Sequence, residues 1–250
     1  YVGAGGFYHY TSKIHKATGS MILDTAIPFI ESPNSEEQAA LSIDLDSNHD
    51  VYLTGYHHGE WTLMKLDRDT GEALLKKTIT ENEDEQDQLS GGIAVYAEGD
   101  VVYVIGNIET TREGSLWELT GKYTPLLISL DAQTFETLSK TFLWGNHELP
   151  SSTVVLKQVG DQTVLLKQLG RYISVELYDD NVLVWERRFE NGHMMTALDL
   201  TVSDGKILIA ASSTWAVPNA ESAGWYAESI HIIELNQDGT LESYSEFPWT

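Results

Sequence analysis

One turn-and-strand pattern recurs along this chain and constrains its fold more than any other feature of the sequence. The segment from Asp46 to Gly55, DSNHDVYLTG, is a polar turn followed by a β-strand. The pattern returns from Glu98 to Gly106 and, more faintly, from Ser203 to Ala210, and a truncated copy opens the chain at Tyr1. Copies separated by about the length of one four-stranded unit are typical of toroidal or solenoidal β architectures.

A second signature follows each copy of the first: a strand that ends in a polar turn and leads into another strand. It is found at Ile14–Gly19, Leu66–Gly71, Leu130–Phe135 and Leu235–Gly239. Alternating apolar residues and short connections then group the strands in fours, as in an antiparallel meander. We therefore predict an all-β fold, a β-propeller of about five four-stranded antiparallel blades in a single domain, residues 1–250. The approximate blades are 1–30, 38–80, 90–145, 151–190 and 195–250.

The first group supplies only three strands, since an innermost strand is missing before Tyr1. By this count the chain holds about nineteen strands where five blades need about twenty. We expect the missing strand beside Tyr1–Gly5 to come from sequence outside these 250 residues or from another chain, which would make this chain part of a larger polypeptide or assembly.

Two long insertions are the features most suggestive of function. Ile108–Thr124 and Ser212–Glu228 fall at corresponding places in the third and fifth groups. Loops on a rigid scaffold often carry recognition, and Trp and Tyr are favoured contact residues. The candidate partner-binding residues are Trp117, Tyr123, Trp215, Trp225 and Tyr226. The alternative is that these aromatic residues fold back to cover the propeller rim.

The stretch from Ala40 to Lys77 resembles the secreted bacterial β-propeller repeat family. The matching residues are Asp46, Asp50, Tyr52, Gly55, Lys65, Leu66, Asp67, Thr70 and Gly71, with His49 in place of the usual turn glycine. The Thr-Gly turn is also similar, more weakly, to quinoprotein-like propellers, whose docking tryptophan is kept here only at Trp185. The resemblance implies a structural repeat and specifies no activity.

The formal charge of −23, from 15 basic and 38 acidic residues, excludes whole classes of partner. Affinity for nucleic acid or anionic lipid is built from Lys and Arg, so neither is expected. No apolar run approaches the roughly 20 residues that cross a bilayer, so direct membrane insertion is not expected either. The acidity suits cations or basic partners, or it serves only to keep a β-rich surface soluble.

A tight series of oxygen-bearing residues forms the candidate metal site. Asp44, Asp46, Asn48 and Asp50 alternate along one loop, as in loops that wrap Ca²⁺. His49 occupies the place of the loop glycine, and no Glu stands at the twelfth position, which is Gly55. The alternative is an Asx-type hairpin turn whose side chains bond backbone N–H groups. We expect either no cofactor or Ca²⁺.

No catalytic motif is present, and the catalytic residues stay unknown. We expect a non-enzymatic scaffold or interaction module at an extracellular, cell-surface or luminal location, binding protein or glycan partners through its aromatic loops. The alternative is a propeller enzyme with a site on the axis, either a quinoprotein-like oxidoreductase or a glycan hydrolase or lyase.

Overall fold

The computed structural model describes β-strands and turns, with no helix among the residues described. These residues are 2–4, 9–14, 21–27, 38–57, 60–79, 91–113, 120–143, 154–169, 171–180, 182–191, 194–216 and 225–248. The strands are β1 (Val2–Ala4), β2 (His9–Ile14), β3 (Met21–Ile27), β4 (Gln38–Leu45), β5 (Val51–His57), β6 (Glu60–Leu66), β7 (Ala73–Ile79), β8 (Gly91–Glu98), β9 (Val101–Glu113), β10 (Thr120–Asp131), β11 (Thr137–Phe142), β12 (Val154–Val159), β13 (Gln162–Leu169), β14 (Tyr172–Asp179), β15 (Val182–Phe189), β16 (Met194–Ser203), β17 (Lys206–Ala216), β18 (Trp225–Asn236) and β19 (Leu241–Pro248).

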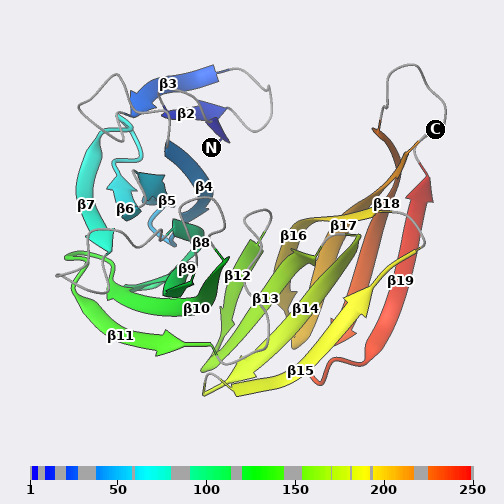
Figure 1. Cartoon of the computed structure of the whole chain (residues 1–250). Helices are drawn as coiled ribbons and strands as arrows, with labels where there is room; N and C mark the ends of the chain where they lie inside the picture. The colour runs from blue at the N-terminus through cyan, green and yellow to red at the C-terminus, as the bar shows by residue number, and fades with distance from the viewer. Residues whose placement is uncertain are drawn as a thin grey trace. The chain divides into compact units, whose positions relative to one another are not determined.

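Each sheet is an antiparallel meander of consecutive strands (Figure 1). Among the described residues four sheets have four strands, β4–β7, β8–β11, β12–β15 and β16–β19, while β1–β3 form a sheet of three. The prediction of about five four-stranded blades is therefore corrected to four. In its described residues the first group contributes three strands, the number that its sequence predicted.

The chain divides into two compact units, Tyr1–Leu149 and Pro150–Thr250. The first unit holds the sheets β1–β3, β4–β7 and β8–β11, and the second holds β12–β15 and β16–β19. In each unit two four-stranded sheets share an apolar core, because strand alternation gives each sheet an apolar face. Val51, Leu53, Met64 and Leu66 form a further buried cluster on the β4–β7 sheet.

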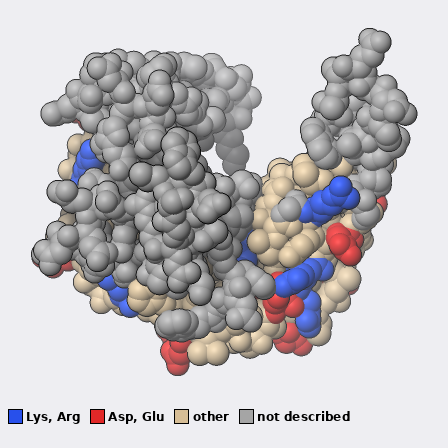
Figure 2. Space-filling model, in the orientation of Figure 1, with Lys and Arg blue, Asp and Glu red and all other residues tan. Residues whose placement is uncertain are grey.

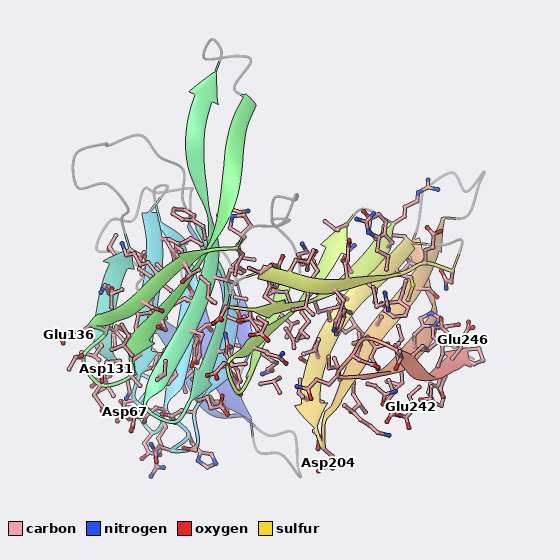
Figure 3. The ribbon with its side chains drawn as sticks, turned by 90° about the horizontal axis from the view of Figure 1, so that it is seen from below. Asp67, Asp131, Glu136, Asp204, Glu242 and Glu246 are labelled. Carbon is pink, nitrogen blue, oxygen red and sulfur yellow. The ribbon has the colours of Figure 1, made fainter. Side chains whose placement is uncertain are left out.

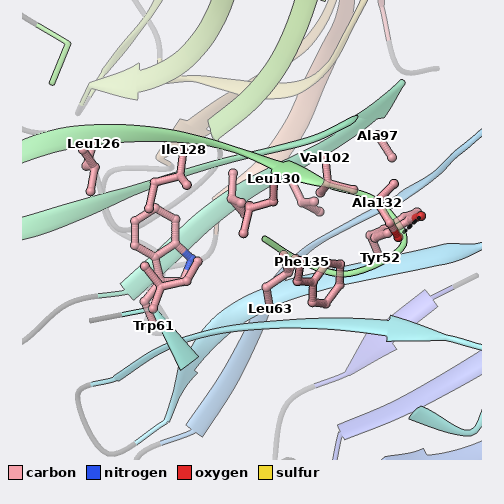
Figure 4. Packing of buried hydrophobic residues seen from close by; sticks show 13 residues of the cluster. Tyr52, Trp61, Leu63, Ala97, Val102, Leu126, Ile128, Leu130, Ala132 and Phe135 are labelled. Atoms are coloured by element: carbon pink, nitrogen blue, oxygen red, sulfur yellow. Dashed lines mark hydrogen bonds between the residues drawn. The ribbon is translucent and has the colours of Figure 1, made fainter. Parts of the chain in front are cut away.

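The core of the first unit lies between the β4–β7 and β8–β11 sheets (Figure 4). Trp61 and Leu63 of β6 are fully buried there with Val102 and Val104 of β9. Gly92 permits this close approach, since a Cβ atom at Gly92 would lie 2.0 Å from the Trp61 indole nitrogen. The residues that gather at this core are Tyr52, Trp61, Leu63, Ile79, Val95, Ala97, Val102, Val104, Leu126, Ile128, Leu130, Ala132 and Phe135.

The strand register confirms that Tyr52 and Tyr103 occupy equivalent positions in successive sheets. Tyr52 pairs with Asp44 and Tyr103 pairs with Tyr96, and each pair follows the same number of residues after a β-bulge. The repeat read from the sequence is thus also a repeat of register.

The core of the second unit lies between the β12–β15 and β16–β19 sheets. Val164, Val175 and Leu177 come from the first of these sheets, and Ile209 and Ile233 come from the second. All five are at most 3% exposed. This apolar contact holds the two sheets face to face.

The predicted polar turns are confirmed between the third and fourth strands of the β4–β7 and β8–β11 sheets, while residues 15–19 of the turn predicted at Ile14–Gly19 lie outside the described residues. The Asp67 carboxylate accepts hydrogen bonds from the backbone N–H groups of Asp69 and Thr70, at 2.9 and 2.7 Å. Asp131 repeats the arrangement with Gln133 and Thr134. The bonds from Thr70 hold the pKa of Asp67 below its usual value. These Asx turns fix the hairpin geometry locally, which is why the sequence alone located them.

Two of the turns use a bulky residue where glycine is expected. His49, in the place of the turn glycine, has a φ of 67°. Phe135 has a φ of 59° at the position that Gly71, with a φ of 72°, fills in the equivalent turn. A left-handed backbone costs an L-residue roughly 1–2 kcal/mol, so both sites carry local strain.

Candidate functional site

The β9–β10 hairpin continues past the sheet to which it belongs. β8 pairs with β9 only as far as Asn107, and β11 pairs with β10 only as far as Leu126. Beyond these points β9 and β10 pair with each other, up to Glu113 opposite Thr120. Figure 3 shows this two-stranded ribbon projecting at the end of the sheet opposite to Asp67 and Asp131.

The β17–β18 hairpin extends in the same way from its own sheet. β16 pairs with β17 as far as Thr214, and β19 pairs with β18 as far as Ser229. Past these residues the hairpin continues to the pair between Ala216 and Trp225. Both hairpins join the second and third strands of a sheet, so they occupy corresponding places in the repeat.

The structure places four of the five candidate aromatic residues in strands. Tyr123 lies in β10 opposite Glu109, and Trp215 lies in β17 opposite Tyr226. Trp225 opens β18, and Trp117 lies outside the described residues. The expectation that both insertions are loops is therefore corrected: most of their described residues extend the neighbouring strands. Repeated Thr and aromatic residues in these segments were a β-propensity signal that the sequence already held.

The proposed metal loop is organised by Asp46. Its Oδ1 accepts hydrogen bonds from the backbone N–H groups of Asn48 and Asp50, at 2.8 and 2.9 Å. Its Oδ2 accepts a bond of 3.3 Å from the Tyr52 hydroxyl. These contacts are those of the Asx-type turn that was the alternative to a calcium loop.

The other two carboxylates of this loop reach different partners. Asp44 accepts a hydrogen bond of 3.0 Å from the backbone N–H of Ala97, on β8. Asp50 forms an ion pair of 2.8 Å with Lys65. Within the part of the chain that the structure describes, no three His, Cys, Asp or Glu side chains are grouped so as to hold a metal ion. Calcium binding at Asp44, Asp46, Asn48 and Asp50 stays a prediction.

Tyr52 and Lys65 form a buried polar link between the two sheets of the first unit. Lys65 Nζ donates a hydrogen bond of 3.2 Å to the carbonyl oxygen of Ala132, and the Tyr52 hydroxyl lies 3.4 Å from the same oxygen. Burial raises the pKa of Tyr52 to about 12. The sequence marked Tyr52 and Lys65 as repeat residues, but it could not show that they meet a carbonyl 67 or more residues away.

A buried ion pair lies on the β12–β15 sheet, and sequence reasoning missed it. Lys167 Nζ lies 2.5 Å from Glu176 Oε1, and their side chains are only 2% and 3% exposed. Glu176 also accepts a hydrogen bond of 2.7 Å from the Tyr178 hydroxyl. Burial, together with the charge of Glu176, raises the pKa of Tyr178 far above its usual value. Every group in this set has a partner, as buried charges require.

A second cluster of polar side chains lies in the second unit, where the β17–β18 hairpin begins to extend past its sheet. His231 is fully buried, and its Nδ1 lies 2.7 Å from the Tyr244 hydroxyl. Ser229 donates a hydrogen bond of 2.7 Å to Glu246 rather than to a histidine. Ser213, opposite Ser229 in the register, has a buried hydroxyl with no hydrogen-bond partner among the described residues. Ser229 and His231 thus bond to different side chains of β19.

The surface of the second unit carries both signs of charge. Figure 2 shows basic side chains close to acidic ones on its described face. Elsewhere in the second unit Lys206 Nζ lies 2.7 Å from Glu234 and 2.8 Å from Glu242. The acidic surplus is thus interspersed with basic groups in this unit. In the described residues no helix has the length and apolar character needed to span a membrane.

Comparison with known proteins supports a β-propeller fold and no family. No protein-family model matches the sequence, and no curated protein matches it. Among solved structures, hydrazine synthase of Kuenenia stuttgartiensis is similar, with a TM-score of 0.53 and 10% identity over 96% of this chain and 62% of that chain. A member of the DUF4221 family from Bacteroides vulgatus has a TM-score of 0.53 and 9% identity over 96% of this chain and 78% of that one. At these identities the likeness shows the fold alone, and the chain spans less than two thirds of the hydrazine synthase chain.

Proposed function

We propose that this chain is a non-enzymatic β-propeller interaction module that works outside the cytosol and binds protein or glycan partners through its two projecting hairpins. The observation that carries the proposal is the pairing of β9 with β10. From Ile108 opposite Thr124 to Glu113 opposite Thr120, the described residues pair only within the hairpin.

A two-stranded ribbon is a poor structure on its own. Isolated hairpins are at best marginally stable in water, because they bury little apolar surface. A ribbon that projects from a sheet therefore gains stability when a partner covers it. The ribbon sequences include Tyr123, Trp215 and Tyr226, residue types that dominate binding energy in many interfaces.

The net negative charge of the chain makes phosphate-rich partners such as nucleic acid unfavourable. At −23 the chain repels phosphate-rich surfaces, so a protein or a neutral glycan suits it better than nucleic acid does.

Trimming the hairpins tests this proposal. One variant replaces residues 108–124 by Asn-Gly between Asn107 and Pro125, which are register partners. The other replaces residues 215–226 by Asn-Gly between Thr214 and Ala227, also register partners. Asn-Gly favours the tight hairpin turn, so each four-stranded sheet should be retained.

Binding is measured on a glycan array and a panel of purified extracellular proteins, with Leu74→Ala, an exposed change on β7, as the control. We expect the unmodified chain and the control to bind and a trimmed variant to lose binding while keeping its melting temperature. Equal binding by both trimmed variants, or turnover of a glycan by the unmodified chain, would contradict the proposal.

A further inference from the structure

Two side chains of β15, the outermost strand of the β12–β15 sheet, donate hydrogen bonds to the turn between β18 and β19 in the next sheet. Trp185 Nε1 donates a hydrogen bond of 3.1 Å to the carbonyl oxygen of Gln237. Two residues further along β15, Arg187 Nε donates a bond of 2.8 Å to the carbonyl oxygen of Gly239. Trp185 and Arg187 thus form a docking pair that locks the two sheets of the second unit together.

The β4–β7 sheet has a docking pair at the same register positions. Leu75 on β7 packs against the core cluster that contains Phe135. Two residues on, Lys77 Nζ donates bonds of 2.6 Å to the carbonyl oxygen of Phe135 and 3.1 Å to the Thr137 hydroxyl. Leu75 and Trp185 are equivalent, since each is the first paired residue after a β-bulge in its outermost strand.

The last sheet of each unit has small hydroxyl side chains at these positions. In β11 the equivalent residues are Ser139 and Thr141, and in β19 they are Ser243 and Ser245. Ser139 bonds to Ser129 of its own sheet at 2.6 Å, and Ser243 bonds to Glu234 of its own sheet at 3.1 Å. Ser139 and Ser243 therefore bond to a neighbouring strand of their own sheet, whereas Trp185 and Lys77 bond to a different sheet.

We infer that the sheets β4–β11, in the unit Tyr1–Leu149, and the sheets β12–β19, in the unit Pro150–Thr250, unfold as two separate cooperative units, each locked by one docking pair. Cooperative units in proteins follow the distribution of buried contacts. Here the interlocking side chains join β4–β7 to β8–β11 and β12–β15 to β16–β19. Each docking pair stabilises the unit that contains it, so its loss should open that unit. This conformational property is independent of the proposed binding role.

Calorimetry of the full chain tests the inference. We expect two unfolding transitions. Trp185→Ala should lower one of them by about 10 °C and leave the other in place, because it removes a large packed side chain from a unit of this size. Trp185→Phe should give a smaller shift of the same transition. A Leu75→Ala/Lys77→Ala variant should lower only the other transition. Val184→Ala and Leu74→Ala, exposed changes on the same two strands, should shift neither.

Hydrogen exchange followed by mass spectrometry assigns each transition to a range of residues. Trp185→Ala should speed exchange in residues 154–248 and leave residues 38–143 unchanged. A single calorimetric transition that both docking variants lower together would overturn the inference, as would faster exchange in both units after either change.

Discussion

The indole ring of Trp185 lies directly over Gly239. A Cβ atom at Gly239 would come within 2.7 Å of that ring, and the φ of Gly239 is +79°. Two separate constraints therefore require glycine at position 239: the backbone has a positive φ, and the Trp185 ring leaves no space for a Cβ atom. Phe135 occupies the equivalent turn position in the first unit, and there the docking strand presents Leu75 rather than tryptophan. The large side chain is on the strand in one unit and on the turn in the other.

Gly239→Ala should lower the free energy of unfolding of the second unit by about 2–3 kcal/mol, the sum of backbone strain and overpacking. Gly205→Ala is the matched control, because Gly205 has a φ of +74° but no atom within 4 Å of the added methyl group. Gly205→Ala should cost only the backbone term, about 1 kcal/mol. Urea unfolding measures both values, and equal losses would show that the Trp185 contact contributes nothing.

His49→Gly should stabilise the first unit by roughly 0.5–1 kcal/mol, because glycine adopts a positive φ without the steric cost that His49 bears. The gain is reduced by the greater freedom of glycine in the unfolded chain. Chemical denaturation measures the change. A lower stability would mean that the His49 side chain contributes more than its backbone strain costs.

Lys167→Met should destabilise the second unit by about 3–5 kcal/mol, since it leaves Glu176 charged, buried and without its cation. The double variant Lys167→Met/Glu176→Gln should recover much of that loss by removing the unpaired charge. The urea concentrations at the unfolding midpoints of the single and the double variant measure this recovery. A double variant no more stable than the single one would argue against the ion pair as the source of the loss.

The Tyr52 hydroxyl should make the first unit sensitive to alkali. Its pKa in the folded chain is about 12, raised from 10.0 by burial, so the native state holds this proton more tightly than the unfolded state. The stability due to this proton is present below pH 10 and is lost as the pH rises towards 12. The Tyr52→Phe variant has no hydroxyl to ionise, so it does not lose this part of the stability at high pH. The stability advantage of the unmodified chain over Tyr52→Phe, about 1 kcal/mol at pH 8, should therefore shrink at pH 11. A constant difference would contradict this assignment.

Asp46→Ala should lower the melting temperature by the same amount in millimolar calcium and in chelator, because its observed contacts are with backbone N–H groups and Tyr52. The loss of these bonds predicts a cost of about 2 kcal/mol. The calcium prediction from the sequence has a different signature. Calcium would raise the melting temperature of the unmodified chain, and Asp46→Ala would abolish the increase. Thermal melts with added calcium and with chelator separate the two results.

Local chemistry was readable in the sequence. The turns at Asp67 and Asp131 depend on side chains that bond to the backbone two and three residues away, so their geometry is written into adjacent positions. The strands of the repeat and the equivalence of Tyr52 and Tyr103 followed from period-two alternation and the repeated turn for the same reason. The sequence did not predict the extra length of β9 and β17. A strand that extends past its sheet buries neither face, so its sequence lacks the alternation of apolar and polar residues that identifies a strand.

The sequence by itself determined that the chain is all β, that its strands form consecutive meanders and where its polar turns lie, because these features rest on interactions between neighbouring residues. Only the tertiary structure decided which distant groups meet. Lys65 reaches the carbonyl of Ala132, Trp185 lies on the turn at Gly239, and Lys167 finds Glu176 on the adjacent strand. A carboxylate-rich sequence offers many possible partners for each cation. The choice among them is made by the packing of strands and sheets, which brings one particular partner within hydrogen-bonding distance.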